Sequence, residues 1–306
     1  MPQKRRIAMK MMTVLVMVLA AAIVLVQAAG HAAMMGPAPI VVQGFQTPES
    51  VLYDSRGDVY LVANINGNPT AADGNGFVSK ISPTGKVIAL KWIDGTKAGV
   101  KLNAPKGMAI VGDTLYVADI TAVRKFNRSS GQFMGSIDIM GSTFMNDLAA
   151  GRDGSVYASD SGLKPDFSSS GTDAVYRIDR MGKVTALAKG ADLNHPNGVA
   201  VRADGTVLVV GFAEKGEVYA LSKDGKRSAV ATLPAGQLDG IEIASNGTLL
   251  VSSWASSSVY RVMRDGMATA VVENVKAPAD IGYDGKRNRV LIPQFQDNKV
   301  LIQALK

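Results

Sequence analysis

The chain has 306 residues, of which 47% are hydrophobic and 19% are charged, and this composition suits a globular protein with a large core. It has no cysteine, which excludes disulfides, thiolate nucleophiles and thiolate metal sites, and its two histidines, His31 and His195, are too few for a three-histidine zinc site. The net charge is +7, but four of the positive charges lie in residues 1–28, which contain no acid. The remaining charge of +3, with no basic run, excludes a nucleic-acid partner.

The first segment has the pattern of an export signal. Four basic residues precede an apolar run from Met11 to Val26, and Val26-Gln27-Ala28 offers small residues for signal peptidase. We predict a signal peptide over residues 1–28 and a linker over 29–38. An uncleaved anchor is the alternative, because sixteen apolar residues are long for a signal peptide and short for a membrane span. In both cases we expect an exported domain, periplasmic or extracellular, with no stable membrane association once the leader is cleaved. The lack of cysteine fits such an oxidising compartment.

From residue 39 onward the sequence consists of short β-branched runs separated by Gly, Asp and Asn turns, with no long segment of helical period. The runs repeat as a unit in which a tight turn such as Arg152-Asp153-Gly154 precedes the second strand, and a second turn precedes a fourth strand such as Lys183–Lys189. Six four-stranded units predict an all-β fold, a six-bladed β-propeller over residues 39–306. A β-sandwich or barrel is the alternative, but neither would generate six equivalent units. The predicted second strands are Asp58–Asn64, Thr114–Asp119, Ser155–Asp160, Thr206–Gly211, Thr248–Ser253 and Arg289–Gln294, and the third strands are Val78–Ile81, Val123–Phe126, Val175–Ile178, Val218–Leu221, Val259–Val262 and Val300–Gln303.

The two ends of this region predict how the ring closes. The sixth unit stops after its third strand, at Leu305-Lys306, whereas Pro39–Gly44 forms an extra strand before the first unit. We predict that this N-terminal strand becomes the outer strand of the last blade, which removes an open sheet edge.

One position of the repeat, just before the first strand, has an oxygen-bearing side chain in four units: Glu49, Asn146, Asn197 and Asp239. The second and sixth units have Lys106 and Ala279 there, so folding alone does not require Asn or Asp. In a propeller the loops entering strand one and those joining strands two and three open on the same face. The long insertions 64–76, 92–104 and 160–173 belong to these loops. We therefore expect the four side chains to converge at the centre of a loop-rimmed face.

Two carboxylates and two amide oxygens form a ligand set suited to Ca²⁺, with Mg²⁺, Mn²⁺ or Zn²⁺ as substitutes. Without the cation the two acids would repel each other, and at least one pKa should rise. For any single residue, a simple turn is the alternative, since Pro-Asn-Gly and Leu-Asp-Gly are common turn formers.

With these residues the chain resembles the senescence marker protein/gluconolactonase family, which includes regucalcin-like lactonases, and more distantly diisopropyl-fluorophosphatase and the paraoxonases. The resemblance rests on Pro48-Glu49, Asn146-Asp147-Leu148, Pro196-Asn197-Gly198-Val199 and Asp239-Gly240-Ile241. It implies a six-bladed propeller with a catalytic divalent cation held by Glu49, Asn146, Asn197 and Asp239. Two features depart from it. The histidine pair of the paraoxonases has no counterpart, and the arginine that binds sugar acids in gluconolactonases is not identifiable.

The leading hypothesis is an exported, metal-dependent hydrolase acting on a small-molecule lactone or related ester. Asp239 is the candidate general base for a metal-activated water, and Lys106 would stabilise developing negative charge, with a rim salt bridge as its alternative role. Asn146 would hold the metal and orient the substrate. Phe212, Trp254 and Phe295 would line an apolar substrate pocket, or pack in the core.

Several polar residues near the site have simpler interpretations. We expect His195 to be structural and Asp147 and Asp280 to form hydrogen bonds rather than bind the metal. Asn64, Asp119 and Asp160, which end second strands, are expected to cap neighbouring loops. A non-catalytic propeller that binds a small ligand or a protein partner, with a structural metal or none, is the alternative function. A metal-free propeller resembling strictosidine synthase is disfavoured because its channel would not need Glu49 together with Asp239. The sequence sets no oligomeric state.

Overall fold

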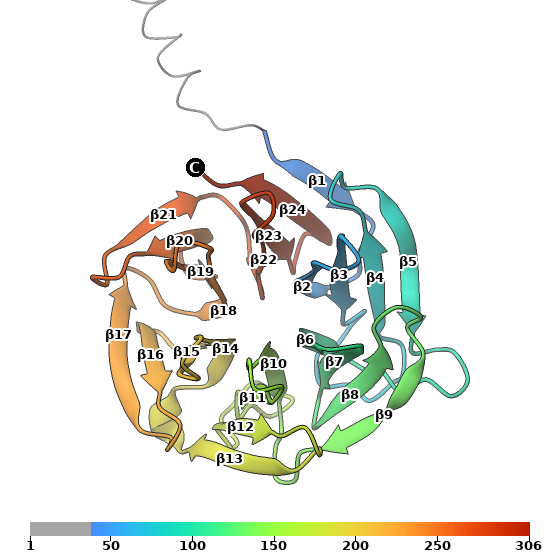
Figure 1. The fold of residues 1–306 in the computed structure, drawn as a ribbon, viewed down its shortest axis with the longest axis horizontal. Helices are drawn as coiled ribbons and strands as arrows, with labels where there is room; N and C mark the ends of the chain where they lie inside the picture. The colour runs from blue at the N-terminus through green and yellow to red at the C-terminus, as the bar shows by residue number, and fades with distance from the viewer. Residues whose placement is uncertain (1–37) are drawn as a thin grey trace, which may run out of the picture. The chain divides into compact units, whose positions relative to one another are not determined.

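The computed structural model describes residues 38–306, which form a ring of six four-stranded antiparallel sheets (Figure 1). The predicted six-bladed β-propeller is confirmed. The predicted signal peptide and nearly all of the predicted linker lie outside the described residues. Blade 1 comprises β2 (Pro48–Asp54), β3 (Val59–Asn64), β4 (Phe77–Ile81) and β5 (Val87–Asp94). Blade 2 comprises β6 (Pro105–Val111), β7 (Thr114–Asp119), β8 (Ala122–Asn127) and β9 (Phe133–Asp138). Blade 3 comprises β10 (Met145–Ala150), β11 (Val156–Asp160), β12 (Ala174–Ile178) and β13 (Val184–Lys189).

The second half of the ring repeats the pattern. Blade 4 comprises β14 (Pro196–Val201), β15 (Val207–Gly211), β16 (Gly216–Leu221) and β17 (Arg227–Leu233), and blade 5 comprises β18 (Leu238–Ile243), β19 (Leu249–Ser253), β20 (Ser258–Val262) and β21 (Ala268–Val272). Blade 6 comprises β22 (Gly282–Asp284), β23 (Arg289–Gln294), β24 (Lys299–Ala304) and the N-terminal strand β1 (Ile40–Gln43). The one helical segment in residues 38–306 is the short 3-10 helix η1 (Ala191–Leu193), and within that range no helix has the length and apolar character to cross a membrane.

Closure of the ring by the N-terminal strand is also confirmed. Strand β1 pairs antiparallel with β24, in a register that runs from Ile40 opposite Ile302 to Gln43 opposite Lys299. The outer edge of the last blade therefore comes from the start of the described chain (Figure 1).

The core lies between neighbouring blades and is built largely from the second strands. Strand β15 is buried along its whole length, and Leu208 and Val210 pack in one cluster with Val251 of the next blade. Burial of one such side chain contributes about 1.5–3 kcal/mol, so the continuous apolar runs of the second strands account for their clear sequence pattern. The outer strands are mostly exposed on one or both faces.

The inner strands of blades 1 to 5 each contain a one-residue register shift near the start, and in blade 6 the shift lies just before β22. In β2, Pro48 lies opposite Asn64 but Ser50 lies opposite Ala63, and in β18 the shift falls between Leu238 and Ile241. The same shift occurs in β6, β10 and β14, and between Pro278 and Gly282 ahead of β22. A β-bulge of this kind leaves one residue unpaired and redirects its side chain. The bulge regions contain Glu49, Lys106, Asn146, Asn197, Asp239 and Ala279.

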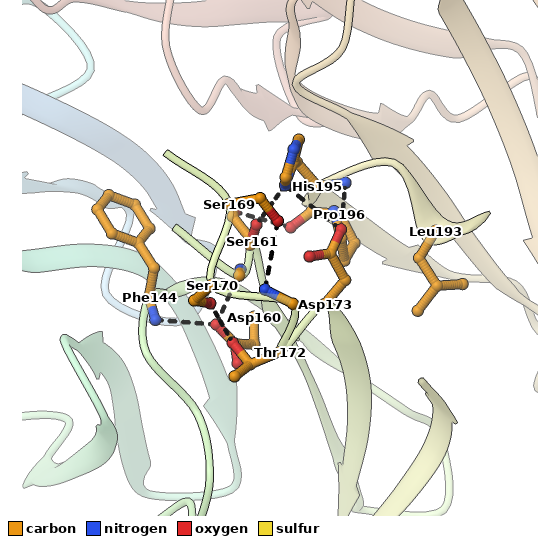
Figure 2. Close-up of polar contacts among 12 residues, drawn as sticks. Phe144, Asp160, Ser161, Ser169, Ser170, Thr172, Asp173, Leu193, His195 and Pro196 are labelled. Carbon is orange, nitrogen blue, oxygen red and sulfur yellow. Dashed lines mark hydrogen bonds and ion pairs between the residues drawn. The ribbon is translucent and has the colours of Figure 1, made fainter. Parts of the chain in front are cut away.

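The polar residues that end second strands fix the loops above the bulges, as predicted. Asn64 Oδ1 accepts a hydrogen bond from the Gln46 N–H (3.0 Å), and Asp119 accepts one from the Ala104 N–H (2.9 Å). Asp160 accepts one from the Phe144 N–H (2.8 Å; Figure 2). The chain leading into each of these inner strands is thereby held against its own blade.

Candidate metal centre and substrate cavity

A cavity of about 310 Å³ lies where the long loops meet the inner strands. Its polar lining consists of one residue from each of blades 1 to 5: Glu49, Lys106, Asn146, Asn197 and Asp239. All five side chains are buried. The structure therefore brings the four predicted metal ligands together with Lys106, because equivalent bulges place equivalent residues at the ring's centre.

The four oxygen-bearing residues share an unusual feature: one side-chain oxygen of each is buried and has no hydrogen-bond partner. These atoms are Glu49 Oε2, Asn146 Oδ1, Asn197 Oδ1 and Asp239 Oδ1. Leaving a buried acceptor unpaired costs about 1–3 kcal/mol, and most buried polar atoms in proteins are paired. Four such atoms around one cavity fit a ligand that accepts lone pairs, which is the property of a metal cation.

The donor set defines which cation the cavity suits. Within residues 38–306 no group of three or more His, Cys, Asp or Glu side chains is placed to hold a metal. The candidate set instead combines two carboxylates with two amides. Oxygen-only sets of this kind suit Ca²⁺ and, with tighter geometry, Mg²⁺ or Mn²⁺.

Ser161, which the sequence reasoning missed, sets the orientation of one amide. The Asn146 Nδ2 group donates a hydrogen bond to Ser161 Oγ (3.1 Å), and the Ser161 hydroxyl donates to the Pro196 carbonyl (2.9 Å) of the next blade. With its nitrogen engaged, Asn146 presents Oδ1 as the unpaired atom. The only signal in the sequence is that Ser161 directly follows the strand-ending Asp160.

The electrostatics of the cavity follow from burial of like charges. Burial raises the pKa of Glu49 well above its usual range, and the negative charges of Asp239 and Asp280 add to the effect while Lys106 opposes it. Burial and the charge of Asp280 likewise raise the pKa of Asp239. The prediction that at least one acid would have a raised pKa is confirmed, and a bound cation would relieve the repulsion.

Lys106 lies in the cavity rather than in a salt bridge. Its Nζ donates hydrogen bonds to the carbonyls of Pro69 (3.0 Å) and Ala104 (3.1 Å) and lies 4.6 Å from the centre of the Phe144 ring. Among the ion pairs of residues 38–306 none includes Lys106, so the predicted alternative of a rim salt bridge is wrong. Burial lowers its pKa, although the charge of Glu49 opposes this.

The residues that follow the bulge positions form a second layer below the cavity. The Ser50 hydroxyl donates to Asp280 Oδ2 (2.6 Å), and Asp147 Oδ2 accepts from the Val199 N–H (2.7 Å). Asp147 and Asp280 therefore form hydrogen bonds, as predicted, and burial raises the pKa of Asp280 to about 7. The strands are close here: a Cβ on Gly240 would lie 2.3 Å from the Ile281 nitrogen.

Apolar side chains make up the rest of the cavity's lining. The Trp254 ring lies 5.5 Å from that of Phe212 and 5.3 Å from that of Phe295, measured between ring centres. None of the apolar lining residues belongs to the core clusters between blades, so the predicted pocket residues Phe212, Trp254 and Phe295 line the cavity instead of packing in the core. The sequence reasoning missed five others: Ile65, Pro69, Phe144, Leu163 and Phe167.

Figure 2 shows how the loop after β11 is anchored beside His195. The His195 ring Nδ1 lies 2.8 Å from the Ser161 carbonyl oxygen, and its backbone N–H donates to Asp173 Oδ2 (2.7 Å). The residue has a φ of 53° and is not part of the cavity's lining. These contacts agree with the structural role predicted for His195.

The fold and the cavity define a class: six-bladed propellers with a polar, oxygen-rich site at the axis. The chain belongs to the SMP-30/gluconolactonase/LRE-like family, whose model matches residues 48–291. The match covers all five polar residues of the cavity. No curated protein sequence matches the chain.

Solved structures share the fold at low sequence identity. A structural-genomics target provisionally described as a gluconolactonase has a TM-score of 0.67 at 17% identity, over 89% of this chain and 96% of that one. A gluconolactonase from Xanthomonas campestris has a TM-score of 0.61 at 20% identity, over 89% of this chain and 99% of that one. Virginiamycin B lyase from Staphylococcus aureus has a TM-score of 0.62 at 12% identity, over 88% of this chain and 100% of that one. Hydrolases and a lyase thus share this architecture, and the fold alone does not define the reaction.

Proposed function

We propose that this protein is an exported, divalent-metal-dependent hydrolase of lactones or related esters. The observation that supports it is the set of four unpaired oxygens, from Glu49, Asn146, Asn197 and Asp239, around one cavity. Membership of a family that includes gluconolactonases supports the reaction class. The proposal of export rests on the leader pattern in residues 1–28.

Glu49, Asn146, Asn197 and Asp239 would hold the cation, with Ca²⁺ as first choice and Mg²⁺, Mn²⁺ or Zn²⁺ as substitutes. A divalent cation supplies a Lewis acid for a substrate carbonyl and lowers the pKa of water. These four side chains would leave room for further ligands, since Ca²⁺ takes about six to eight oxygens.

The protein's own groups supply the proton transfer and the positioning. Asp239 accepts a proton from the attacking water, whose oxygen bonds to the carbonyl carbon of the lactone. The carbon–oxygen bond of the ring ester then breaks, and Asp239 returns its proton to the leaving oxygen, which gives a hydroxy acid and restores the carboxylate. The buried ammonium group of Lys106 stabilises the negative charge that develops on the carbonyl oxygen. Asn146, held by Ser161, orients the substrate.

The substrate in this proposal is a small molecule, because a cavity of about 310 Å³ is at the lower end of small-ligand sites. The modest charge of the chain after its leader offers no surface for nucleic acid. With the leader cleaved, we propose a protein without stable membrane association.

A screen of lactones, esters and phosphotriesters, run with and without chelator, tests the function, together with metal analysis of the purified protein. We expect lactone turnover that chelator abolishes and Ca²⁺, Mn²⁺ or Zn²⁺ restores. If no substrate is hydrolysed with any of these cations, the protein is a non-catalytic binding propeller instead.

A further inference from the structure

The two parts of the cavity differ in chemistry. Its floor has all the polar side chains, one from each inner strand of blades 1 to 5. Above the floor the lining is apolar, and its members come from every blade but the second: Ile65, Pro69, Phe144, Leu163, Phe167, Phe212, Trp254 and Phe295. We call these eight residues the apolar wall.

The apolar wall is assembled from loops on both halves of the ring. Phe212, Trp254 and Phe295 follow the second strands of blades 4, 5 and 6 and form a continuous row of rings, at 5.5 and 5.3 Å between centres. On the other half, Phe144 and Phe167 of blade 3 lie 6.3 Å apart. Phe167 has a φ of 61°, at the tip of the loop after β11.

The wall offers almost no hydrogen-bonding group to a ligand. Its only polar side-chain atom is the Trp254 indole nitrogen, which is buried and has no partner. A sugar lactone has a hydroxyl group on most of its ring carbons, and each would lose its water without gaining a partner from the wall. The polar groups of the floor are occupied by the candidate cation and the reacting carbonyl.

We infer that the substrate has an apolar group, an alkyl chain or an aromatic ring, next to its lactone or ester, and that polyhydroxylated sugar lactones are poor substrates. This inference rests on the proposed hydrolase function. The cavity of about 310 Å³ is about twice the size of an apolar cavity that holds one benzene ring, about 150 Å³. A six-membered lactone with one short alkyl or aryl substituent therefore fits.

A comparison of three six-membered lactones tests the inference: unsubstituted δ-valerolactone, its butyl derivative δ-nonalactone, and glucono-δ-lactone. The reacting ring is the same in all three, so the substituents account for differences in kcat/KM. We expect kcat/KM for δ-nonalactone to exceed that for glucono-δ-lactone by about 100-fold or more, since one methylene in an apolar pocket changes it by about 10- to 200-fold. Preference for glucono-δ-lactone would overturn the inference and leave the hydrolase function intact.

A variant links the preference to the wall. Phe167→Ser should lower the ratio of kcat/KM for δ-nonalactone over that for δ-valerolactone by about tenfold, because it removes one ring and adds a hydroxyl. The side chain is 57% exposed at a loop tip, so the fold should tolerate the change. Met140→Ser, at an 85% exposed apolar residue outside the cavity, is the matched control and should leave the ratio unchanged. An unchanged ratio in Phe167→Ser contradicts the role of the wall.

A binding measurement separates failure of the inference from failure of the proposed function. The lactam analogue of δ-nonalactone cannot be hydrolysed readily, and its binding in the presence of chelator is followed by tryptophan fluorescence, with Trp254→Phe as control. If no lactone is hydrolysed but this lactam binds at least tenfold more tightly than the unsubstituted lactam, the apolar site stands and the hydrolase proposal fails. If the two lactams bind equally weakly, the inference is wrong.

Discussion

The propeller has a cavity at each end of its central channel, and the larger is not the better candidate site. The cavity on the face of the short turns has about 450 Å³ and is lined by residues such as Arg56, Arg128 and Asp280. Both arginines of its lining are in ion pairs, Arg56 with Asp113 and Arg128 with Asp54. None of its lining residues, all within the described part of the chain, has a buried polar atom without a partner, whereas five lining residues of the smaller cavity have one.

The comparison shows that buried polar atoms without a partner distinguish the two cavities, whereas volume alone would favour the other one. Both cavities are bounded by the same inner strands, and one residue step separates Asn146, facing the upper cavity, from Asp147, facing the lower. Hydrogen bonds from the backbone engage Asp147, and the Ser50 hydroxyl engages Asp280. In the upper cavity one buried oxygen of each of four residues, Glu49, Asn146, Asn197 and Asp239, has no such partner, and this favours the upper cavity as the candidate site.

Removing the proposed base should have the largest effect. We expect Asp239→Asn to lower kcat/KM for a lactone substrate by about a hundred- to ten-thousand-fold, the usual contribution of a general base. The measurement is steady-state hydrolysis, with circular dichroism to show that the variant is folded.

The matched control makes the same change of carboxylate to amide in the lower cavity. Glu242→Gln should leave kcat/KM within a few-fold of the wild-type value. Equal losses in the two variants would show that the cavities do not differ as we propose.

Asp280 should make the metal-free protein less stable as pH rises. Its pKa is about 7 in the folded protein and about 3.8 in the unfolded chain, so the folded state holds the proton more tightly between these values. Stability from this group is full below about pH 4 and is lost as pH rises through 7, by up to about 4 kcal/mol. Urea unfolding of the wild type and Asp280→Asn from pH 4 to 8, with chelator, measures the difference. Parallel curves for the two proteins would rule out the effect.

A divalent cation should stabilise the wild-type fold. At a hundred times its dissociation constant the cation adds about 2.7 kcal/mol to the free energy of unfolding, which raises Tm by about 5–10 °C. Thermal unfolding with and without Ca²⁺ measures this shift. Glu49→Gln should reduce the shift, because it removes one of the two charged ligands, while Glu242→Gln should retain it. A full shift in Glu49→Gln would exclude that residue as a ligand.

The smallest effect should come from removing the hydrogen bond that orients the Asn146 amide. We expect Ser161→Ala to weaken cation binding by about 10- to 100-fold, because Asn146 loses the hydrogen bond that orients it. Calorimetric titration with Ca²⁺ measures the affinity. Ser256→Ala is the control, since the Ser256 hydroxyl is buried without a partner and lies outside the cavity. Equal losses in both variants would show that Ser161 has no special role.

The propeller and the positions of the four oxygen-bearing residues followed from the sequence because the repeat encodes both. The second strands were located to within a residue, since their apolar runs are buried between blades; Asp58 was assigned to a strand but has a φ of 48° and belongs to the turn. The bulges were not predicted, because a one-residue register shift leaves the apolar pattern unchanged on both sides.

The supporting residues of the site could not be read from the repeat. Ser161 contacts a carbonyl of the next blade, a relation that depends on how two blades pack. Phe144 and Phe167 lie in loops, where neither helical nor strand periodicity applies, and only the folded loops place their rings over the cavity. Lys106 has no ion pair because loop carbonyls satisfy its ammonium group instead.

The closure of blade 6 has a consequence for how the protein is made. Among the strands of residues 38–306, β1 is synthesised first and its partner β24 last, so Ile40 must find Ile302 across nearly the whole ring. Contacts between such distant residues form slowly. Until then blade 6 lacks its outer strand, and an unpaired strand edge stays open to other chains. Sealing the ring should therefore be the last and slowest event of maturation.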